Sequence, residues 1–196
     1  FSSNGGPKKE FWEYDPTLNS WTQKSDFAGP ARFWAVGFSI GNNGYVGTGY
    51  NNYLIYYKDF WEYDPALNAW IQKTDFPLIE RYKAIGFSIN GKGYLGTGST
   101  YYNEEIYHKD FWEYDPVLNN WVEKADFGGP VRYDAVGFHI NNKGYLGTGQ
   151  SKSGYAKDFW EYDPALNTWM QKADFAGTAR ANAIAFSIGG KGYAGT

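Results

Sequence analysis

The sequence contains no cysteine, one methionine and two histidines, and none of its hydrophobic runs approaches the roughly 20 residues of a membrane-spanning helix. The missing cysteines exclude disulfides, thiolate metal sites and cysteine nucleophiles. His108 and His139 are too far apart for an i, i+2 or i, i+4 metal pair, so no metal site is expected. The sequence also lacks a Gly-x-Ser-x-Gly elbow, a phosphate loop and an EF-hand loop, and we expect no cofactor.

An excess of positive charge is also missing. The chain has 18 Lys and Arg residues against 21 Asp and Glu residues, so its formal net charge is −3. A protein that binds nucleic acid regardless of sequence needs a basic face that displaces counterions. We therefore expect neither a nucleic-acid partner nor a membrane span.

Aromatic residues and glycine are abundant instead. Trp, Tyr and Phe make up 21% of the chain, and there are 25 glycines. Aromatic side chains are enriched in β-strands, and glycine supplies the turns between short strands. The composition therefore predicts an all-β protein.

Two motifs repeat in step along the chain. The hexapeptide Phe-Trp-Glu-Tyr-Asp-Pro begins at Phe11, Phe60, Phe111 and Phe159, and the segment Gly-Tyr-x-Gly-Thr begins at Gly44, Gly93, Gly144 and Gly192. The successive steps are 49, 51 and 48 residues for both motifs. Two landmarks that shift together indicate four copies of one unit, and we treat residues 1–196 as a single repeat array.

Each unit predicts four short strands, a to d, joined by turns. Around the third unit, strand a spans about 133–140, strand b 145–148, strand c 157–162 and strand d 168–172. The a–b turn at 141–144 is rich in Asn and Gly, and the c–d turn at 163–167 contains Asp-Pro. A loop of variable sequence at 150–156 joins strands b and c.

Four antiparallel strands in about 50 residues match the kelch period. The glycines of Gly47-Thr48-Gly49, followed by Tyr63 and Trp70, resemble the kelch repeat as found in the central domain of galactose oxidase, and the other units match likewise. The resemblance implies a β-propeller of four-stranded antiparallel kelch blades, with four repeats per chain. The oxidase activity itself needs a Tyr–Cys cross-link and is excluded. Gly-Thr-Gly replaces the adjacent Gly-Gly of the family.

Three ways of closing the ring are open. Strand b of the last unit could pair with strand c of the first, which gives a four-bladed monomer. Two chains could share their half-blades in one eight-bladed ring, or the chain could be a fragment of a longer propeller. We favour a dimeric or larger ring over the four-bladed monomer.

Aromatic residues also mark one face of the expected ring. Seven aromatics recur in every unit and are interpreted as packing between blades. The remaining 13, Phe1 among them, fall in the b–c loops or at the entry to strand a, which lie at the same end of the sheets. These Tyr-rich loops could simply pack on one another. We prefer a ligand-binding surface, for which the candidates are Trp34, Tyr53, Tyr57, Tyr82, Tyr102, Tyr107 and Tyr133.

The four arginines occupy one column of the repeat, at the start of strand a on the same face: Arg32, Arg81, Arg132 and Arg180. A planar guanidinium can bind carboxylate, sulfate or phosphate, and kelch adaptors that bind acidic peptides use arginine at the matching position. The alternative is a structural role, in which each arginine pairs with the backbone of an adjacent blade or with the aspartate six residues earlier, namely Asp26, Asp75, Asp126 or Asp174. The residue two beyond each arginine varies, as expected for a pocket: Trp34, Lys83, Asp134 and Asn182.

These features predict a binding or scaffold propeller whose loop face recognises an acidic peptide, a protein loop or a glycan. One alternative is a sugar-modifying enzyme resembling the kelch-type sialic-acid epimerases, with Glu80, Glu104 or Glu105 in proton transfer. Another is an engineered or purely structural repeat without a ligand. The lack of cysteine in a Tyr-, Asn- and Gly-rich kelch array resembles secreted or cell-surface bacterial repeats.

Overall fold

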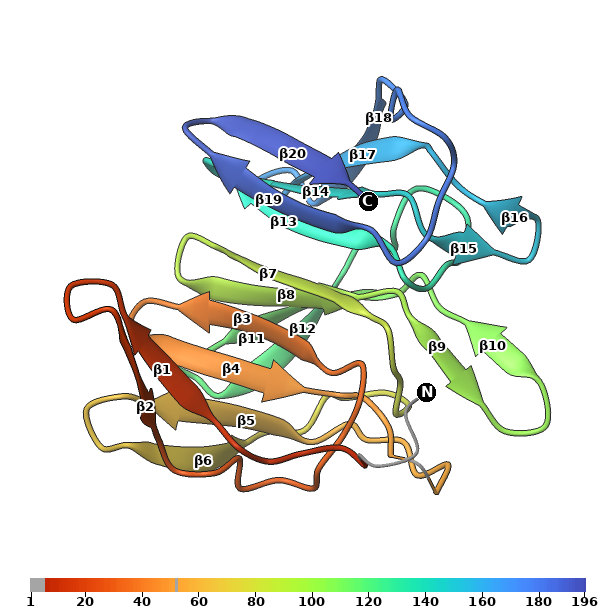
Figure 1. Cartoon of the computed structure of the whole chain (residues 1–196). Coiled ribbons are helices and arrows are strands. Elements are labelled where there is room, and N and C mark those ends of the chain that lie inside the picture. Colours follow the sequence, from red (N-terminus) through yellow and green to blue (C-terminus); the bar gives the residue numbers. More distant parts are fainter. Residues whose placement is uncertain (1–5, 52) are drawn as a thin grey trace.

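A computed structural model describes residues 6–51 and 53–196, so Phe1 lies outside the described residues (Figure 1). The described residues form β-strands joined by turns and loops, without a helix. Three complete four-stranded antiparallel sheets lie side by side along the chain, each with its four strands in sequence order apart from short inserted hairpins. The all-β prediction is confirmed.

In each of the three complete sheets, the strands begin and end at almost the same positions of the repeat. Sheet I contains β3 (Val36–Ile40), β4 (Asn43–Gly47), β5 (Phe60–Asp64) and β6 (Ala69–Lys73). Sheet II contains β7 (Ile85–Ile89), β8 (Lys92–Gly96), β11 (Phe111–Asp115) and β12 (Asn120–Lys124). Sheet III contains β13 (Val136–Ile140), β14 (Lys143–Gly147), β17 (Phe159–Asp163) and β18 (Thr168–Lys172).

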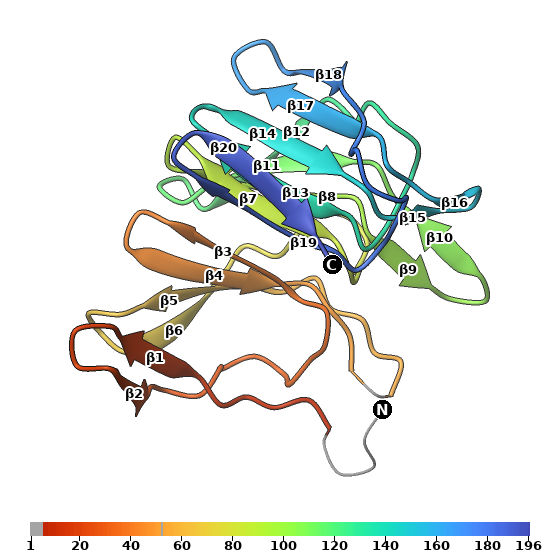
Figure 2. The ribbon, with the colours of Figure 1, turned by 45° about the horizontal axis from the view of Figure 1, so that its top comes forward.

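The chain also carries two half-sheets. The N-terminal half-sheet consists of β1 (Trp12–Asp15) and β2 (Ser20–Gln23), and the C-terminal half-sheet of β19 (Ile184–Ile188) and β20 (Lys191–Gly195). In Figure 1 the N-terminal half-sheet lies beside sheet I and the C-terminal half-sheet beside sheet III; Figure 2 shows β19 and β20 in front of β7 and β13. Within the described residues β1 and β20 pair only with their own hairpin partners, so the pairing that would close a four-bladed monomer is not formed.

Turn chemistry sets the strand boundaries. In sheet I, Asp64 Oδ1 accepts a hydrogen bond from Ala66 N at 2.8 Å, and Asn68 takes a left-handed φ of 48°. Asparagine tolerates this conformation better than other residues that carry a side chain. The a–b turn of sheet II likewise places Asn90 and Gly91 at φ values of 50° and 77°. The predicted position of the c–d turn is confirmed. The a–b turn lies within the predicted stretch 141–144 but is only two residues long, because β14 already begins at Lys143.

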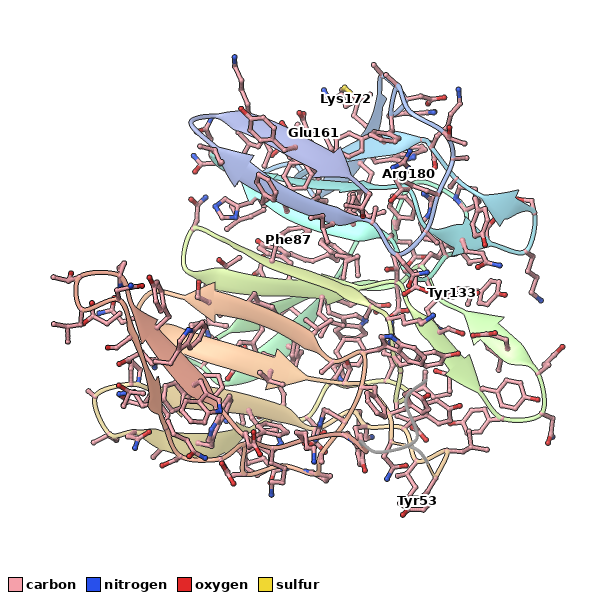
Figure 3. All side chains as sticks on the ribbon, viewed as in Figure 1. Tyr53, Phe87, Tyr133, Glu161, Lys172 and Arg180 are labelled. Atoms are coloured by element: carbon pink, nitrogen blue, oxygen red, sulfur yellow. The ribbon has the colours of Figure 1, made fainter. Side chains whose placement is uncertain are left out.

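The core lies between neighbouring sheets. Phe60 of sheet I packs edge-on against Tyr114 of sheet II at 4.8 Å and contacts Trp121 at 5.0 Å between ring centroids. Phe87, labelled in Figure 3, contacts the backbone of Gly144 in sheet III, where even a methyl group would collide with its ring. The recurring aromatics of the complete sheets therefore form the packing between blades, as predicted.

The variable loops contain structure that the sequence did not predict. The loop of sheet II forms the hairpin β9 (Ser99–Tyr101) and β10 (Glu105–Tyr107), and that of sheet III forms β15 (Gln150–Ser151) and β16 (Gly154–Tyr155). Isolated bridges tie each loop to the entry of the innermost strand, for example between Tyr82 and Ser99. These loops are therefore held against the loop end of the sheets.

Candidate binding site at the loop face

The arginine column is buried. Arg132 forms a bidentate pair with Asp158, with Nη1–Oδ1 and Nη2–Oδ2 distances of 2.7 Å, and its side chain has no exposed surface. Arg32 pairs with Asp59 in the same way. Arg81 forms an ion pair with Asp110 in which only Nη1 makes a hydrogen bond to the carboxylate. The aspartate partners considered from the sequence were wrong: Asp126 and Asp174 lie beside lysines. Three of the four arginines, Arg32, Arg81 and Arg132, instead bind the aspartate directly before the third strand of their own sheet.

Each buried arginine also fixes the Gly-Thr-Gly segment. Arg132 Nη1 donates to the carbonyl oxygen of Thr148 at 2.7 Å, and Thr148 has a left-handed φ of 57°. The guanidinium lies 4.7 Å from the centre of the Phe127 ring. Because paired oxygens and an aromatic ring surround these groups, Arg32, Arg81 and Arg132 expose almost no guanidinium surface to a ligand.

The electrostatics of Asp158 agree with this arrangement. Burial raises the pKa of Asp158, but hydrogen bonds from Arg132 and Trp160 outweigh that effect and hold the pKa below its usual range. Arg180 differs from the other three: it donates to the carbonyl oxygens of Thr178 and Thr196 and forms no ion pair within the described residues.

The residues two positions beyond the arginines line the inner rim. Trp34, Lys83, Asp134 and Asn182 all have left-handed φ values between 50° and 56°. Lys83 N donates to Trp34 O, and Asp134 N to Lys83 O, both at 3.2 Å; Asn182 N continues the series with Asp134 O. The Lys83 ammonium pairs with the Asp134 carboxylate at 2.5 Å and lies 4.4 Å from the Trp34 ring. The rim charges therefore neutralise each other.

Aromatic side chains surround this rim. We call the following set the aromatic mouth: Phe33, Trp34, Tyr50, Tyr56, Tyr82, Tyr107 and Tyr133. Trp34 and Tyr50 stack at 5.0 Å between ring centroids with an angle of 10° between their planes, and Tyr56 also stacks on Tyr50, at 5.7 Å. Tyr82 contacts all three of these rings. Trp34 is 39% exposed, so the stack remains open to solvent.

Hydrogen bonds fix the polar ends of the aromatic mouth. Tyr82 Oη donates to Glu105, which also accepts a hydrogen bond from Ser99 Oγ at 2.9 Å. Tyr133 Oη donates to Gln150 Oε1 at 2.8 Å. Burial raises the pKa of Tyr133 to about 12 and, together with the nearby Glu105, also raises that of Tyr82. Both phenols therefore stay protonated, and the rings are held in place.

The other aromatic candidates are divided between different surroundings. Tyr57 lies 4.4 Å beneath the Arg32 guanidinium and accepts a hydrogen bond from Asn51, so it belongs to the buried column. Tyr53 is 84% exposed and stands apart from the aromatic mouth, although it lies on the same side of the molecule as Tyr133 (Figure 3). Tyr50 and Tyr56 belong to the 13 aromatics that the sequence places on the loop face, but they were not among the named candidates. Their bridge with each other brings the two rings together.

A pocket adjoins the aromatic mouth at Tyr56, between the loops of sheets I and II. Its lining residues are Leu54, Ile55, Tyr56, Glu80, Tyr101 and Tyr102. Tyr102 Oη donates to Glu80 at 3.1 Å. Glu104 is exposed, and Glu105 is engaged by Tyr82 and Ser99. The structure does not bring these three glutamates together with a free arginine.

The described residues show no metal-binding cluster of His, Asp or Glu side chains. His108 is half-buried, with Nε2 at 2.9 Å from Thr100 Oγ1. Burial and the charge of Arg81 lower the pKa of His108 to about 4. No helix that could cross a membrane occurs in the described part of the chain.

Comparison with known proteins gives a structural match only. No protein-family model matches the sequence, and no curated protein is similar to it. Among solved structures, that of YjhT, a kelch-type β-propeller, matches with a TM-score of 0.76 and 19% sequence identity. The match covers 91% of this chain but only 63% of YjhT. The chain has a propeller-like fold. At this identity the likeness concerns the fold alone.

Proposed function

We propose that the protein is a binding propeller whose aromatic mouth holds a neutral glycan. The observation that carries the proposal is the solvent-exposed Trp34–Tyr50 stack, surrounded by charged groups that are already paired with each other. An apolar aromatic platform with a few fixed polar groups is the usual composition of a small-molecule site. A sugar ring offers an apolar C–H face for stacking and hydroxyl groups for the polar rim.

The pairing of the arginines makes an anionic ligand less suitable. Three of the four guanidinium groups are occupied by Asp59, Asp110 and Asp158, and Lys83 is paired with Asp134. An acidic peptide would have to compete with these carboxylates at close range. A sialic-acid epimerase would need a free arginine clamp beside Glu80 or Glu105, and the same pairing argues against it.

A panel of neutral hexasaccharides (cello-, xylo-, manno- and chito-) tests the proposal by isothermal titration calorimetry. We expect at least one to bind, and Trp34→Ala to weaken that binding by about 30-fold, because a central aromatic contact is worth roughly 2 kcal/mol. Leu118→Ala is the matched control, since Leu118 is 68% exposed on the c–d turn at the opposite end of the sheets. Binding that survives Trp34→Ala, or binding of acidic peptides alone, contradicts the proposal.

A further inference from the structure

The two half-sheets carry complementary groups that are unused in a single chain. In sheet I, β4 pairs with β5 in the register Gly44–Tyr63, Tyr45–Glu62, Val46–Trp61 and Gly47–Phe60. The strands β20 and β1 have the same sequence pattern, but within the described residues their facing edges are unpaired. An open strand edge is a ready template for a strand from another chain.

We infer that β20 of one copy pairs with β1 of a second copy, so that each end of the chain completes a four-stranded sheet. Two copies then contribute six complete sheets and two shared ones to a single ring with twofold symmetry. This inference does not depend on the proposed glycan binding.

The first complementary pair is Arg180 and Glu10. Glu10 occupies the repeat position of Asp59, Asp110 and Asp158, each of which binds the arginine of its own sheet. Glu10 is exposed, and neither it nor Arg180 forms an ion pair within the described residues. In the shared sheet, the Arg180 guanidinium meets the Glu10 carboxylate of the second copy.

Two further polar pairs repeat across the shared sheet. Tyr45, Tyr94 and Tyr145 donate to Glu62, Glu113 and Glu161 at 2.6–2.8 Å in the complete sheets. The corresponding pair is Tyr193 with Glu13. Glu13 already forms an ion pair with Lys24 at 3.1 Å, and each corresponding glutamate of the complete sheets forms one with the lysine of its own fourth strand. Lys92 binds Asp115 and Lys143 binds Asp163, which makes Lys191 and Asp15 the third pair.

An apolar pocket lies where the aromatic side chains of β1 and β2 from the second copy would pack. It lies beside β20 and is lined by Tyr145, Phe159, Ala173, Phe175 and Tyr193, among others. In the complete sheets the corresponding space is filled: Tyr162 and Trp169 of sheet III pack on Phe111 at 4.9 and 5.0 Å. Tyr14 and Trp21 are their counterparts. They are 45% and 65% exposed, whereas Tyr114 and Tyr162 are fully buried.

The separation of the two half-sheets favours a second copy over closure within one chain. The strand β19 packs beside β13 of sheet III, whereas Phe11, directly before β1, packs on Tyr63 and Trp70 of sheet I. Within the described residues β1 and β20 do not pair with each other, and in the inferred dimer the second copy supplies the missing strands.

Light scattering and native mass spectrometry on the 196-residue chain test the inference. The expected mass is twice the chain mass of 22.2 kDa. Glu10→Arg and Arg180→Glu should each weaken dimerisation by about 100-fold or more, since each leaves like charges facing each other. An equimolar mixture of these two variants should restore a mixed dimer, because each introduced charge then faces its opposite. If the unmodified chain keeps a mass of 22.2 kDa at its highest soluble concentration, the inference is overturned. This holds whether β1 and β20 remain unpaired or pair with each other within one chain.

A variant without a change of charge distinguishes loss of dimerisation from loss of folding. A Cβ on Gly47 would lie 2.6 Å from the Phe60 ring, and one on Gly96 would lie 2.7 Å from the Phe111 ring, whereas a Cβ on Gly195 would have nothing within 4 Å. Gly195→Ala should therefore leave the urea unfolding of the isolated chain unchanged and weaken dimerisation by about tenfold or more. Leu18→Ala is the control, since Leu18 is 73% exposed and its counterparts in complete sheets are equally exposed. A Gly195→Ala chain that dimerises like the parent also overturns the inference.

Discussion

Replacing Arg132 by methionine should destabilise the chain strongly. The side chain is fully buried and makes two 2.7 Å bonds to Asp158 and another to Thr148 O. Methionine keeps much of the apolar volume but leaves a largely buried carboxylate without its partner, which costs about 3–5 kcal/mol. At a typical urea dependence of about 2–3 kcal/mol per molar, the midpoint of unfolding falls by about 1–2 M.

A second substitution separates charge from packing. Asp158→Asn removes the charge and can still accept the hydrogen bond from Trp160 Nε1, which is 2.8 Å long in the parent. Arg132→Met with Asp158→Asn should therefore be more stable than Arg132→Met alone, by about 2 kcal/mol. The control is Lys152→Met on the exposed β15–β16 hairpin, with a change below about 0.5 kcal/mol. An Arg132→Met chain as stable as this control would refute a structural role for the arginine column.

Three further predictions concern stability in urea. Gly147→Ala should lower the free energy of unfolding by about 2 kcal/mol or more, because its Cβ would collide with the Phe159 ring and lie 2.9 Å from Asp158 O. A loss below about 0.5 kcal/mol would contradict the close contact between Gly147 and Phe159. Asn119→Ala should lower the free energy of unfolding by about 2–3 kcal/mol, because Tyr114 Oη and Thr74 N lose their hydrogen-bond acceptor and alanine is strained at a φ of 50°. Asn19→Ala should lower it by less, because the Asn19 side chain accepts a hydrogen bond only from Tyr14 within the described residues. His108 has a folded pKa of about 4, below its unfolded value, so the unfolded state binds more protons and stability falls as the pH drops from about 6.5 towards 4. In His108→Gln, the free energy of unfolding should fall by about 1–2 kcal/mol less than in the parent between pH 7 and pH 5. If both proteins lose the same stability over this range, His108 is not a buried neutral histidine.

The sequence predicts the repeat and its strands well because local chemistry sets them. Asp-Pro and Asn-Gly turns fix the strand ends, and the recurring aromatics fix which faces pack together. The partners of the arginines were not predictable in this way. Arg132 lies 26 residues from Asp158 along the chain, and only the pairing of β14 with β17 brings the two side chains together. Proximity in sequence pointed to Asp126 instead.

The candidate site was predicted at the level of a face rather than of particular contacts. The position of Trp34 beside the central rim follows from the repeat, but its stacking on Tyr50 depends on a loop without repeated sequence. The hairpin β9–β10 was also missed, because its strands are only three residues long and are held by the bridge between Tyr82 and Ser99. Loop conformation of this kind depends on tertiary contacts, which a local pattern does not contain.

The most direct test of ligand binding at the aromatic mouth is a nitrogen–proton NMR spectrum of the nine tryptophan indoles during titration with the tightest neutral hexasaccharide. The indoles of Trp61, Trp112 and Trp160 donate to Asp59, Asp110 and Asp158 at 2.6–2.9 Å and serve as internal references. We predict that the Trp34 signal shifts in a saturable way while these three stay in place. A titration that shifts the three reference signals and leaves Trp34 unchanged would contradict the account.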